Sequence, residues 1–273
     1  MRSTDSNLKR YVVTGSSSGI GKALQLRYAE FPEHFGGELI FELNGWRLGS
    51  ELDYQFDNCM IIHLAHDRSL NFLENTAAFE KLSKNVSAGS IFLSTVSAHS
   101  QSKSIYGRSK YFLEQNFLRH GAAVVKSGLI CSQKPTAMFK TLTDIVNQLP
   151  IIPLPFRGDK LFYLTDEESL VTLIAQLTHA SDNLTYRAFS SKGITFKELL
   201  KDLAHMQGVK RFFVGLPAPI SSLGIAVLSK FLGRLSFSDS LNSLIYTLDP
   251  HDLLELADCA VNFPPKPHLI KYN

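Results

Sequence analysis

The chain has 273 residues, of which 44% are hydrophobic and 19% are charged. A chain of this length and composition can bury a full core, which excludes disorder as its main state. It carries 28 Lys and Arg against 25 Asp and Glu, a net charge of +3. This charge is too small and too dispersed to indicate nucleic acid as the main partner, although scattered cations can still hold a phosphate-bearing small molecule.

Three cysteines lie far apart in the chain, at Cys59, Cys131 and Cys259, and no CxxC pair is present. This spacing argues against a disulfide framework, and neither the cysteines nor His63 and His66 complete a metal site. The first ten residues lack the apolar region of a signal peptide, and no apolar run reaches about 18 residues. We therefore expect no metal and a reducing, cytoplasmic compartment.

Short apolar segments alternate with helical patterns over the first half of the chain. The first helix runs from near Ile20 to just before Pro32, because a proline disfavours the helical conformation of the residue before it. Strands are predicted at 11–13, 39–43, 60–64, 91–94 and 122–129, and further helices at 73–86 and 106–118. Strands that are apolar on both sides and alternate with helices indicate a parallel sheet covered on both faces. We therefore predict an α/β fold with a Rossmann-type doubly wound parallel sheet.

The pattern changes beyond the last of these strands. The proline-rich residues 150–158 are predicted to form a loop, and Thr165 and Glu168 have the spacing of a capping box for a helix to about Leu177. Further helices are expected at 196–206, 220–232 and 237–248. We predict a sheet domain over 8–184, whose loop 150–160 faces the cleft, and a small, mainly helical lobe over 185–273 packed on it.

A glycine-rich loop, Thr14-Gly15-x-x-x-Gly19-x-Gly21, follows the first strand and opens the first helix. Gly15 permits a tight turn, Gly19 lets the backbone approach a pyrophosphate, and Gly21 lets the helix pack on the strand. The first gap is longer than in G-x-G-x-x-G, and a Gly/Ser turn that merely caps a helix is the alternative. The strand before and the helix after favour a dinucleotide site.

Tyr106 and Lys110 lie four residues apart, which places a phenol and an ammonium on one face of a helix. A phenol works as an acid or base near neutral pH only when its anion is stabilised, and a neighbouring ammonium does this. Hydroxyls at Ser94, Thr95 and Ser97 end the strand upstream, where one can hold a substrate oxygen. A surface Tyr/Lys contact beside a Ser-rich loop is the structural alternative.

Taken together and in this order, these segments resemble the short-chain dehydrogenase/reductase family. The loop 14–21 has the glycine spacing of its compact members. Residues 62–67 (Ile-His-Leu-Ala-His-Asp) resemble the HLA segment of the extended, NAD-dependent epimerase/dehydratase members, and Asn75 and Glu114 stand where such members often carry these residues. The resemblance covers about residues 10–130.

The resemblance implies a role for each matched residue. Tyr106 is the general acid/base, Lys110 supports it and binds the nicotinamide ribose, and Thr95 supplies the hydroxyl, with Ser94 and Ser97 as contenders. Residues 8–184 then form the NAD(P)-binding domain and 185–273 the substrate-binding lobe. The residues expected at the cofactor are Gly15, Ser17, Ser18, Gly19, Ile20, Gly21, Arg47, Leu64, Ala65, His66, Tyr106, Lys110, Gly128 and Leu129.

Some features depart from the family pattern. The segment between the second strand and His63 leaves little room for a further helix and strand, so the adenine side is expected to be abbreviated. No Asp or Glu clearly ends the second strand as a ribose clamp, whereas Arg47 can hold a 2′-phosphate or remain a solvated loop residue. The cofactor is therefore NADP or NAD, with a slight preference for NADP. Lys126-Ser127 stands where extended members tend to carry Arg-Pro.

The expected function is an NAD(P)-dependent oxidoreductase or epimerase acting at a carbinol or carbonyl carbon, with a nucleotide sugar as the substrate class that the resemblance implies. A non-catalytic NAD(P)-binding sensor or assembly protein and a simple carbonyl reductase are the alternatives. By the same resemblance we expect a homodimer formed through the helix of Tyr106, with Tyr111, Phe112 and Phe117 at the contact. The amphipathic residues 220–235 favour packing against the core or a partner over contact with a membrane surface.

Overall fold

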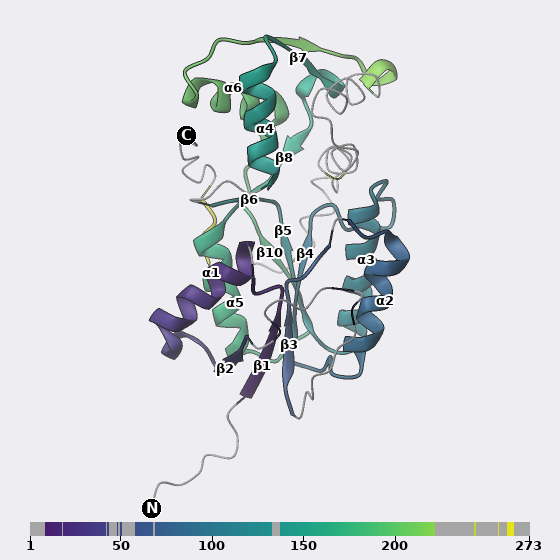
Figure 1. Cartoon of the computed structure of the whole chain (residues 1–273), viewed down its shortest axis with the longest axis vertical. Helices are drawn as coiled ribbons and strands as arrows, with labels where there is room; N and C mark the ends of the chain where they lie inside the picture. Colours follow the sequence, from purple (N-terminus) through teal and green to yellow (C-terminus); the bar gives the residue numbers. More distant parts are fainter. Residues whose placement is uncertain are drawn as a thin grey trace, which may run out of the picture.

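A six-stranded parallel sheet forms the centre of the molecule (Figure 1). The computed structural model describes residues 9–17, 19–41, 43, 48, 50, 58–67, 69–132, 137–221, 243, 256 and 261–264. In sheet order the strands are β10 (Thr185–Ala188), β5 (Ala123–Ser127), β4 (Ile91–Thr95), β3 (Met60–His63), β1 (Lys9–Thr14) and β2 (Gly37–Ile40). The predicted α/β class with a doubly wound parallel sheet is confirmed.

The order of the strands reverses at β1, because the chain continues to β2 on one side and to β3 on the other. In open parallel sheets, ligands bind at such a reversal, outside the carboxyl ends of the strands. Among the described residues, β2 is the edge strand on its side, next to β1, and no further helix or strand follows it in the chain before β3. The predicted abbreviation of the adenine side concerns residues 44–57, most of which lie outside the described residues, and it stays a prediction.

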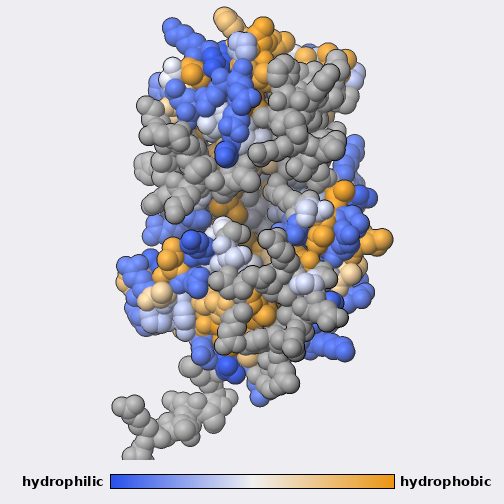
Figure 2. Space-filling view, in the orientation of Figure 1, coloured by the Kyte–Doolittle hydropathy of each residue, from blue (hydrophilic) through white to orange (hydrophobic). Residues whose placement is uncertain are grey.

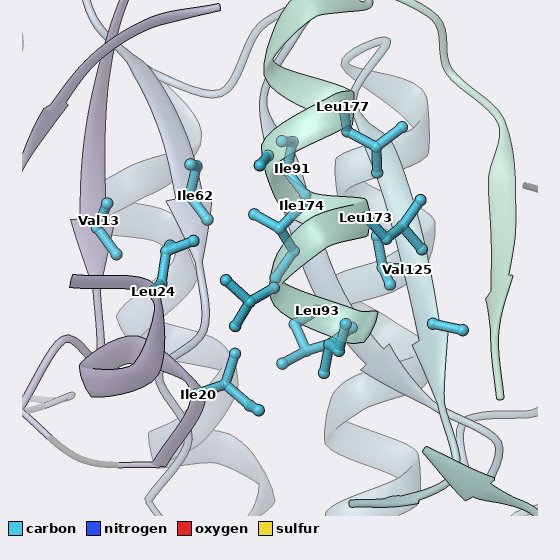
Figure 3. Packing of buried hydrophobic residues seen from close by; sticks show 14 of the residues in the cluster. Val13, Ile20, Leu24, Ile62, Ile91, Leu93, Val125, Leu173, Ile174 and Leu177 are labelled. Carbon is cyan, nitrogen blue, oxygen red and sulfur yellow. The ribbon is translucent and has the colours of Figure 1, made fainter. Parts of the chain in front are cut away.

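Helices cover both faces of the sheet (Figure 1). On one face lie α1 (Gly19–Glu30) and α5 (Glu167–His179), and on the other α2 (Phe72–Ser83) and α3 (Ile105–Arg119). Figure 3 shows Leu24 of α1 near Val13 and Ile62 of the sheet, and Ile174 of α5 near Ile91, within one buried cluster. Each such side chain, when fully buried, contributes roughly 1.5–3 kcal/mol.

One hydrogen bond ties β1 to the end of α5. The Tyr11 hydroxyl donates to the carbonyl of Thr178 over 2.8 Å, which satisfies one of the carbonyls left open in the last helical turn. Burial raises the pKa of Tyr11 to about 12. The first strand of the sheet is thus joined to a helix more than 160 residues later in the chain.

A second, smaller packing unit lies beyond the carboxyl ends of the strands (Figure 1). Its core joins α4 (Ala137–Gln148) to α6 (Phe196–Met206), and the rings of Phe162 and Phe196 stack inside it with centroids 5.2 Å apart. The remaining elements of the chain are η1 (Pro32–His34), β6 (Leu129–Cys131), α4 (Ala137–Gln148), β7 (Ile151–Leu154), η2 (Pro155–Gly158), β8 (Leu161–Phe162), β9 (Leu164–Asp166), β11 (Ile194–Thr195), α6 (Phe196–Met206), β12 (Phe212–Gly215) and η3 (Ala218–Ile220).

Several predicted elements are corrected. The loop expected at 150–158 contains β7, which pairs with β12 in a two-stranded sheet where Pro153 is tolerated. Asp166, not Thr165, caps α5, because the Thr165 hydroxyl is already bonded to Ala188 and Gly128. The second predicted strand, 39–43, begins two residues earlier and ends at Ile40.

The later part of the chain is less helical than expected, since β10, β11 and β12 also lie there. The helix predicted at 196–206 is confirmed as α6, whereas those at 220–232 and 237–248 lie almost wholly outside the described residues. The domain division at residue 185 stays a prediction. β10 begins at that residue and pairs with β5 of the central sheet. Within the described part of the chain, none of the helices has the length and apolar character needed to span a bilayer.

Candidate functional site

The glycine loop joins the carboxyl end of β1 to α1 and packs tightly against its neighbours. Gly15 has a φ of +75°, and a Cβ on it would lie 2.7 Å from the backbone nitrogen of Ala65. A Cβ on Gly21 would lie 2.1 Å from the Gly15 carbonyl oxygen. Both positions therefore exclude a side chain, and the loop, α1 and the segment after β3 touch one another.

The tip of this loop has open space around it, whereas its base is crowded. Gly19 has a φ of +55°, and a Cβ added there would meet nothing within 4 Å in the described part of the chain. The Ser16 hydroxyl is buried and has no hydrogen-bond partner among the described residues. Open space, a buried hydroxyl and the N-terminus of α1 together fit a bound pyrophosphate.

The other predicted cofactor residues of the loop differ in their surroundings. Ser17 is exposed, whereas the side chain of Ile20 is buried in the core beneath α1. Ile20 can therefore face a ligand only through its backbone. Ser18 and Arg47 lie outside the described residues.

His63 at the end of β3 is a structural residue. A 2.7 Å hydrogen bond joins its Nδ1 to Thr14 Oγ1 at the end of β1, and its ring stacks against Phe92 and Phe117. Burial, with a smaller effect from the charge of Lys110, lowers the pKa of His63 to about 3. The imidazole is thus neutral and holds the carboxyl ends of two neighbouring strands together.

The segment after β3, residues 64–67, is held at both of its ends. The Leu64 amide donates to the Thr14 carbonyl over 3.2 Å. Asn75 is buried, and its amide group donates to the Asp67 carbonyl over 2.9 Å and accepts from the Asp67 N–H over 3.4 Å. Ala65 and His66 therefore occupy fixed positions beside the glycine loop.

Three hydroxyls lie at or just after the end of β4, and their hydrogen bonds distinguish them. Ser94 donates to Glu114 over 2.7 Å, and Ser97 donates to the Ser243 carbonyl over 2.5 Å. Thr95 only accepts a long hydrogen bond, 3.4 Å, from the Ser97 N–H. Among the described residues, no group accepts a hydrogen bond from the Thr95 hydroxyl.

The start of α3 is fixed against the loop that follows β4. Ser104 caps the helix by accepting from the Gly107 N–H over 2.9 Å. A Cβ on Gly107 would lie 2.3 Å from the Ser97 carbonyl, so a glycine is needed for the helix to approach so closely. This approach carries Tyr106 to the carboxyl end of the sheet, where its half-buried ring meets His66 edge to face with centroids 4.6 Å apart.

Lys110 lies one turn further along α3 and is 2% exposed. Its Nζ donates to the Leu93 carbonyl over 2.8 Å and sits 4.8 Å from the centre of the Phe92 ring. These contacts point the ammonium toward the end of β4. The predicted pair therefore shares one helix and one end of the sheet.

Sequence reasoning missed a buried charge pair beneath these residues. Lys126 of β5 forms a 2.9 Å ion pair with Glu114 of α3 and donates to the Ala98 carbonyl over 2.7 Å. Glu114 also accepts the hydrogen bond from Ser94. The signal was a lysine directly after the apolar residues of β5 and an acid four residues after Lys110, but only the fold brings them together.

Gly128 follows β5 at the same end of the sheet. Its N–H donates to the Thr165 hydroxyl over 2.8 Å, and a Cβ on it would lie 2.0 Å from the Tyr163 carbonyl. Leu129 begins β6, which pairs with β9, and packs partly against the core of the second unit. The two residues thus lead from the sheet into that unit.

Two further predictions concern metals and partners. In the part of the chain that the structure describes, no three His, Cys, Asp or Glu side chains are grouped to hold a metal ion. Of the aromatic residues expected at a dimer contact, Phe117 is fully buried in the core, so its assignment was wrong. Phe112 is 41% exposed and remains a candidate.

No protein-family model and no curated protein matches the chain, but solved structures do. A dTDP-4-dehydrorhamnose reductase from Bacillus anthracis in complex with NADP is 17% identical and covers 91% of this chain and 98% of its own, with a TM-score of 0.59. RMD from Pseudomonas aeruginosa complexed with NADPH is 18% identical, with 87% and 98% covered and a TM-score of 0.56. A UDP-glucose 4-epimerase from Thermotoga maritima with UDP-glucose is 16% identical, with 76% and 85% covered and a TM-score of 0.54. The chain has the Rossmann-type α/β fold of these structures.

Proposed function

We propose that the protein is an NAD(P)-dependent oxidoreductase or epimerase that acts at a carbinol or carbonyl carbon, with Tyr106 as general acid/base. One chain of contacts carries the proposal. Gly15 of the glycine loop touches Ala65, and the next residue, His66, touches Tyr106. A dinucleotide loop and a phenol thus meet through two adjacent residues at the strand reversal, where ligands of such sheets bind.

The residues present fit a nicotinamide dinucleotide. The open tip at Gly19, the buried Ser16 hydroxyl and the N-terminus of α1 would hold its pyrophosphate. Leu64 and Gly128, which follow two strands at the same end of the sheet, would border its nicotinamide half. When bound, such a group supplies or accepts the hydride.

Tyr106 holds or takes the proton of the reacting hydroxyl. In reduction it donates the proton to the carbonyl oxygen, and in oxidation it accepts the proton of the carbinol. Lys110 carries a buried positive charge one helical turn away, which favours the phenolate that the second of these steps requires. The protein thereby supplies the proton at the oxygen of the carbon that exchanges hydride.

Thr95 is the hydroxyl that we assign to the substrate oxygen. Ser94 and Ser97 donate their hydroxyl hydrogens to Glu114 and to the Ser243 carbonyl, so neither offers its hydrogen to a ligand without losing a buried bond. Thr95 has no such bond to lose among the described residues. Its position at the last residue of β4 favours contact with a ligand at the strand ends.

The substrate class is a nucleotide-linked sugar. Three solved structures of the same fold support this choice, since they are a dehydrorhamnose reductase, an epimerase with UDP-glucose and a protein in complex with UDP-glucose and NAD. NADP is the preferred cofactor, because Arg47 suits a 2′-phosphate, and two similar structures contain NADP or NADPH.

The first test is a fluorescence titration with NADPH and NADH, followed by turnover on a panel of nucleotide sugars and simple ketones. Tyr106→Phe is expected to bind the cofactor as the wild type does and to lower kcat by at least about 100-fold, the usual range for loss of a general acid/base. Exposed His205→Ala, on α6, is the matched control. Full turnover in Tyr106→Phe would contradict the mechanism.

The buried Lys110 ammonium donates to the Leu93 carbonyl, and this contact occupies the group that was expected to bind the nicotinamide ribose. This observation favours a second candidate, a non-catalytic NAD(P)-binding protein of the same fold. Such a protein needs the loop but no acid/base. Tight binding of one reduced cofactor without turnover across the whole panel would support this candidate over the enzyme. Turnover of ketones but of no nucleotide sugar would indicate a simple carbonyl reductase.

A further inference from the structure

The two-stranded sheet of β7 and β12 is apolar on both of its faces. The inner face packs into the core of the second unit through Ile152, Leu154 and Phe213. Because side chains alternate across a strand, the neighbours of these residues point the other way. This outer face, which we call the outer strip, consists of Ile151, Pro153, Phe212 and Val214.

The outer strip is exposed to solvent. Phe212 is 76% exposed, its register partner Ile151 is 57% exposed, and Val214 is 48% exposed. An antiparallel sheet with only one face on a core carries polar side chains on the other, and this small parallel sheet does not. Apolar side chains gathered on a surface and bordered by polar ones mark a contact with another molecule or with a membrane.

Cations flank the outer strip at both ends. Lys210 and Arg211 come directly before β12, and Lys210 is exposed. Arg157 is exposed at the other end, where its N–H donates to the Leu216 carbonyl over 2.9 Å. Its Cγ would lie 3.6 Å from a Cβ on Gly215, so its side chain begins beside the end of β12. The apolar centre therefore has positive charge on either side.

The unit around the strip is also positively charged. Residues 137–164 and 192–221 hold eight Lys and Arg against four Asp and Glu, whereas the other described residues hold twelve against eleven. This uneven charge favours an anionic partner and disfavours a second copy of the chain, in which like charges would meet. A stable protein interface takes about 20–30 residues a side, many more than the strip and its cations supply.

We infer that the outer strip and its flanking cations form a contact site for the surface of an anionic lipid bilayer. β7 lies toward one end of the longest axis of the molecule (Figure 1), so a flat surface can reach it without meeting the central sheet. Phe212 and Ile151 would enter the boundary between headgroups and acyl chains, and the cations would face the anionic headgroups. The inference goes beyond the proposed function and does not depend on it. It concerns this strip and not residues 220–235, for which packing stays the prediction.

Sedimentation of the full chain with vesicles tests the inference. The vesicles contain phosphatidylcholine alone or with about one third phosphatidylserine, whose charge attracts exposed cations. The wild type should bind the anionic vesicles, and added salt should weaken the binding because it screens those cations. Phe212→Ser should lower the partition coefficient at least about tenfold, the change expected when one large apolar side chain no longer leaves water. Lys210→Gln/Arg157→Gln should lower it roughly fivefold for each cation removed.

Leu26→Ser is the matched control, because Leu26 is 63% exposed but lies on α1, beside the central sheet. It should bind vesicles as the wild type does. A second readout locates the contact directly. The fluorescence emission of Phe212→Trp should shift to the blue when anionic vesicles are added, whereas that of Leu26→Trp should not, since only the first ring would reach the membrane interface.

A wild type that does not sediment with the anionic vesicles would overturn the inference. So would a Phe212→Ser variant that binds as tightly as the wild type, or equal losses in Phe212→Ser and Leu26→Ser. A doubled mass that Phe212→Glu alone abolishes would assign the strip to a contact between copies of the chain. Binding to soluble polyglutamate but not to vesicles would assign it to an acidic protein. Either result replaces the bilayer as the partner.

Discussion

The pKa of His63 shows how strongly the surroundings of a residue can change its protonation. The bond of His63 to Thr14 joins the ends of β1 and β3, and the rings of Phe92 and Phe117 leave it no contact with water. Its pKa is about 3 in the folded protein against 6.5 for an ordinary histidine. The residue therefore binds a proton in the unfolded chain at pH values where the folded chain does not.

This difference predicts a loss of stability in acid. The stabilisation is fully present above pH 6.5 and is lost as the pH falls toward about 3, because only the unfolded state gains the proton in that window. The free energy of unfolding should fall by about 1.4 kcal/mol per pH unit more steeply in the wild type than in His63→Asn. Urea unfolding between pH 6 and pH 4.5 measures the two slopes. The exposed His205→Asn should keep the wild-type slope, and parallel slopes for the wild type and His63→Asn would contradict the prediction.

At the level of elements, the pair of Glu114 and Lys126 connects α3 to β5 and, through Ser94, to β4. Both side chains are about 95% buried. A buried charge that loses its partner keeps the cost of its desolvation without the compensating attraction. The pair thereby fixes the helix that carries Tyr106 and Lys110 to the strand that carries Thr95.

Glu114→Gln should lower the free energy of unfolding by about 3–5 kcal/mol, because Lys126 would remain buried and charged. The matched control is Glu38→Gln in the exposed pair of Arg10 and Glu38, whose atoms are 3.0 Å apart and whose side chains are nearly half exposed. That change should cost less than about 1 kcal/mol. Urea unfolding of the two variants at neutral pH gives the comparison. Equal costs would show that burial does not set the strength of the Glu114 pair.

The strands and helices of the sheet were predictable, because apolar runs and helical patterns alternate clearly up to β5. The errors arose where a distant residue decides the outcome. Thr165 has a good capping sequence, but Ala188 and Gly128 engage its hydroxyl, and Asp166 caps the helix instead. Likewise, no residue near Pro153 in the sequence indicates that β12 will pair with β7.

The candidate site likewise combines features that the sequence predicts with contacts that only the fold produces. Spacing within a short segment identified the glycine loop and the pair of Tyr106 and Lys110. The contact of His66 with Tyr106 spans 40 residues of chain, and that of Thr14 with His63 spans 49. Side-chain contacts of this kind depend on how the strand ends are arranged, which the pattern of one sequence does not contain.

At the scale of the whole molecule, apolar side chains reach the surface over α2 and α3 (Figure 2). Leu73 of α2 is 72% exposed, and the 41% exposed Phe112 of α3 contacts Phe72 with ring centroids 6.1 Å apart. The homodimer that the family resemblance leads us to expect would bury this surface. A second exposed apolar site, Phe212, lies in the other unit, on β12, and provides an internal comparison.

Light scattering at micromolar concentration should give twice the mass of one chain for the wild type. The double variant Leu73→Glu/Phe112→Glu should give the mass of one chain, because two buried carboxylates per subunit would face an apolar contact. Phe212→Glu should leave the mass unchanged. A monomeric wild type, or a double variant that stays dimeric, would contradict a dimer formed through this surface.

The order in which the chain visits its two cores has a mechanical consequence. Among the described residues, it passes from the sheet core at Val125 to the second core at Cys131, returns between Leu164 and Leu170, leaves again between Ala188 and Ile194, and is back in the sheet core at Phe263. Two bodies joined by a single linker can swing as on a hinge, but two bodies joined by several separate segments move apart only if every segment changes conformation. Any opening between the units must bend all of them at once. A substrate would therefore enter and leave through small, shared displacements, and a protease that cuts one connection would not release either half.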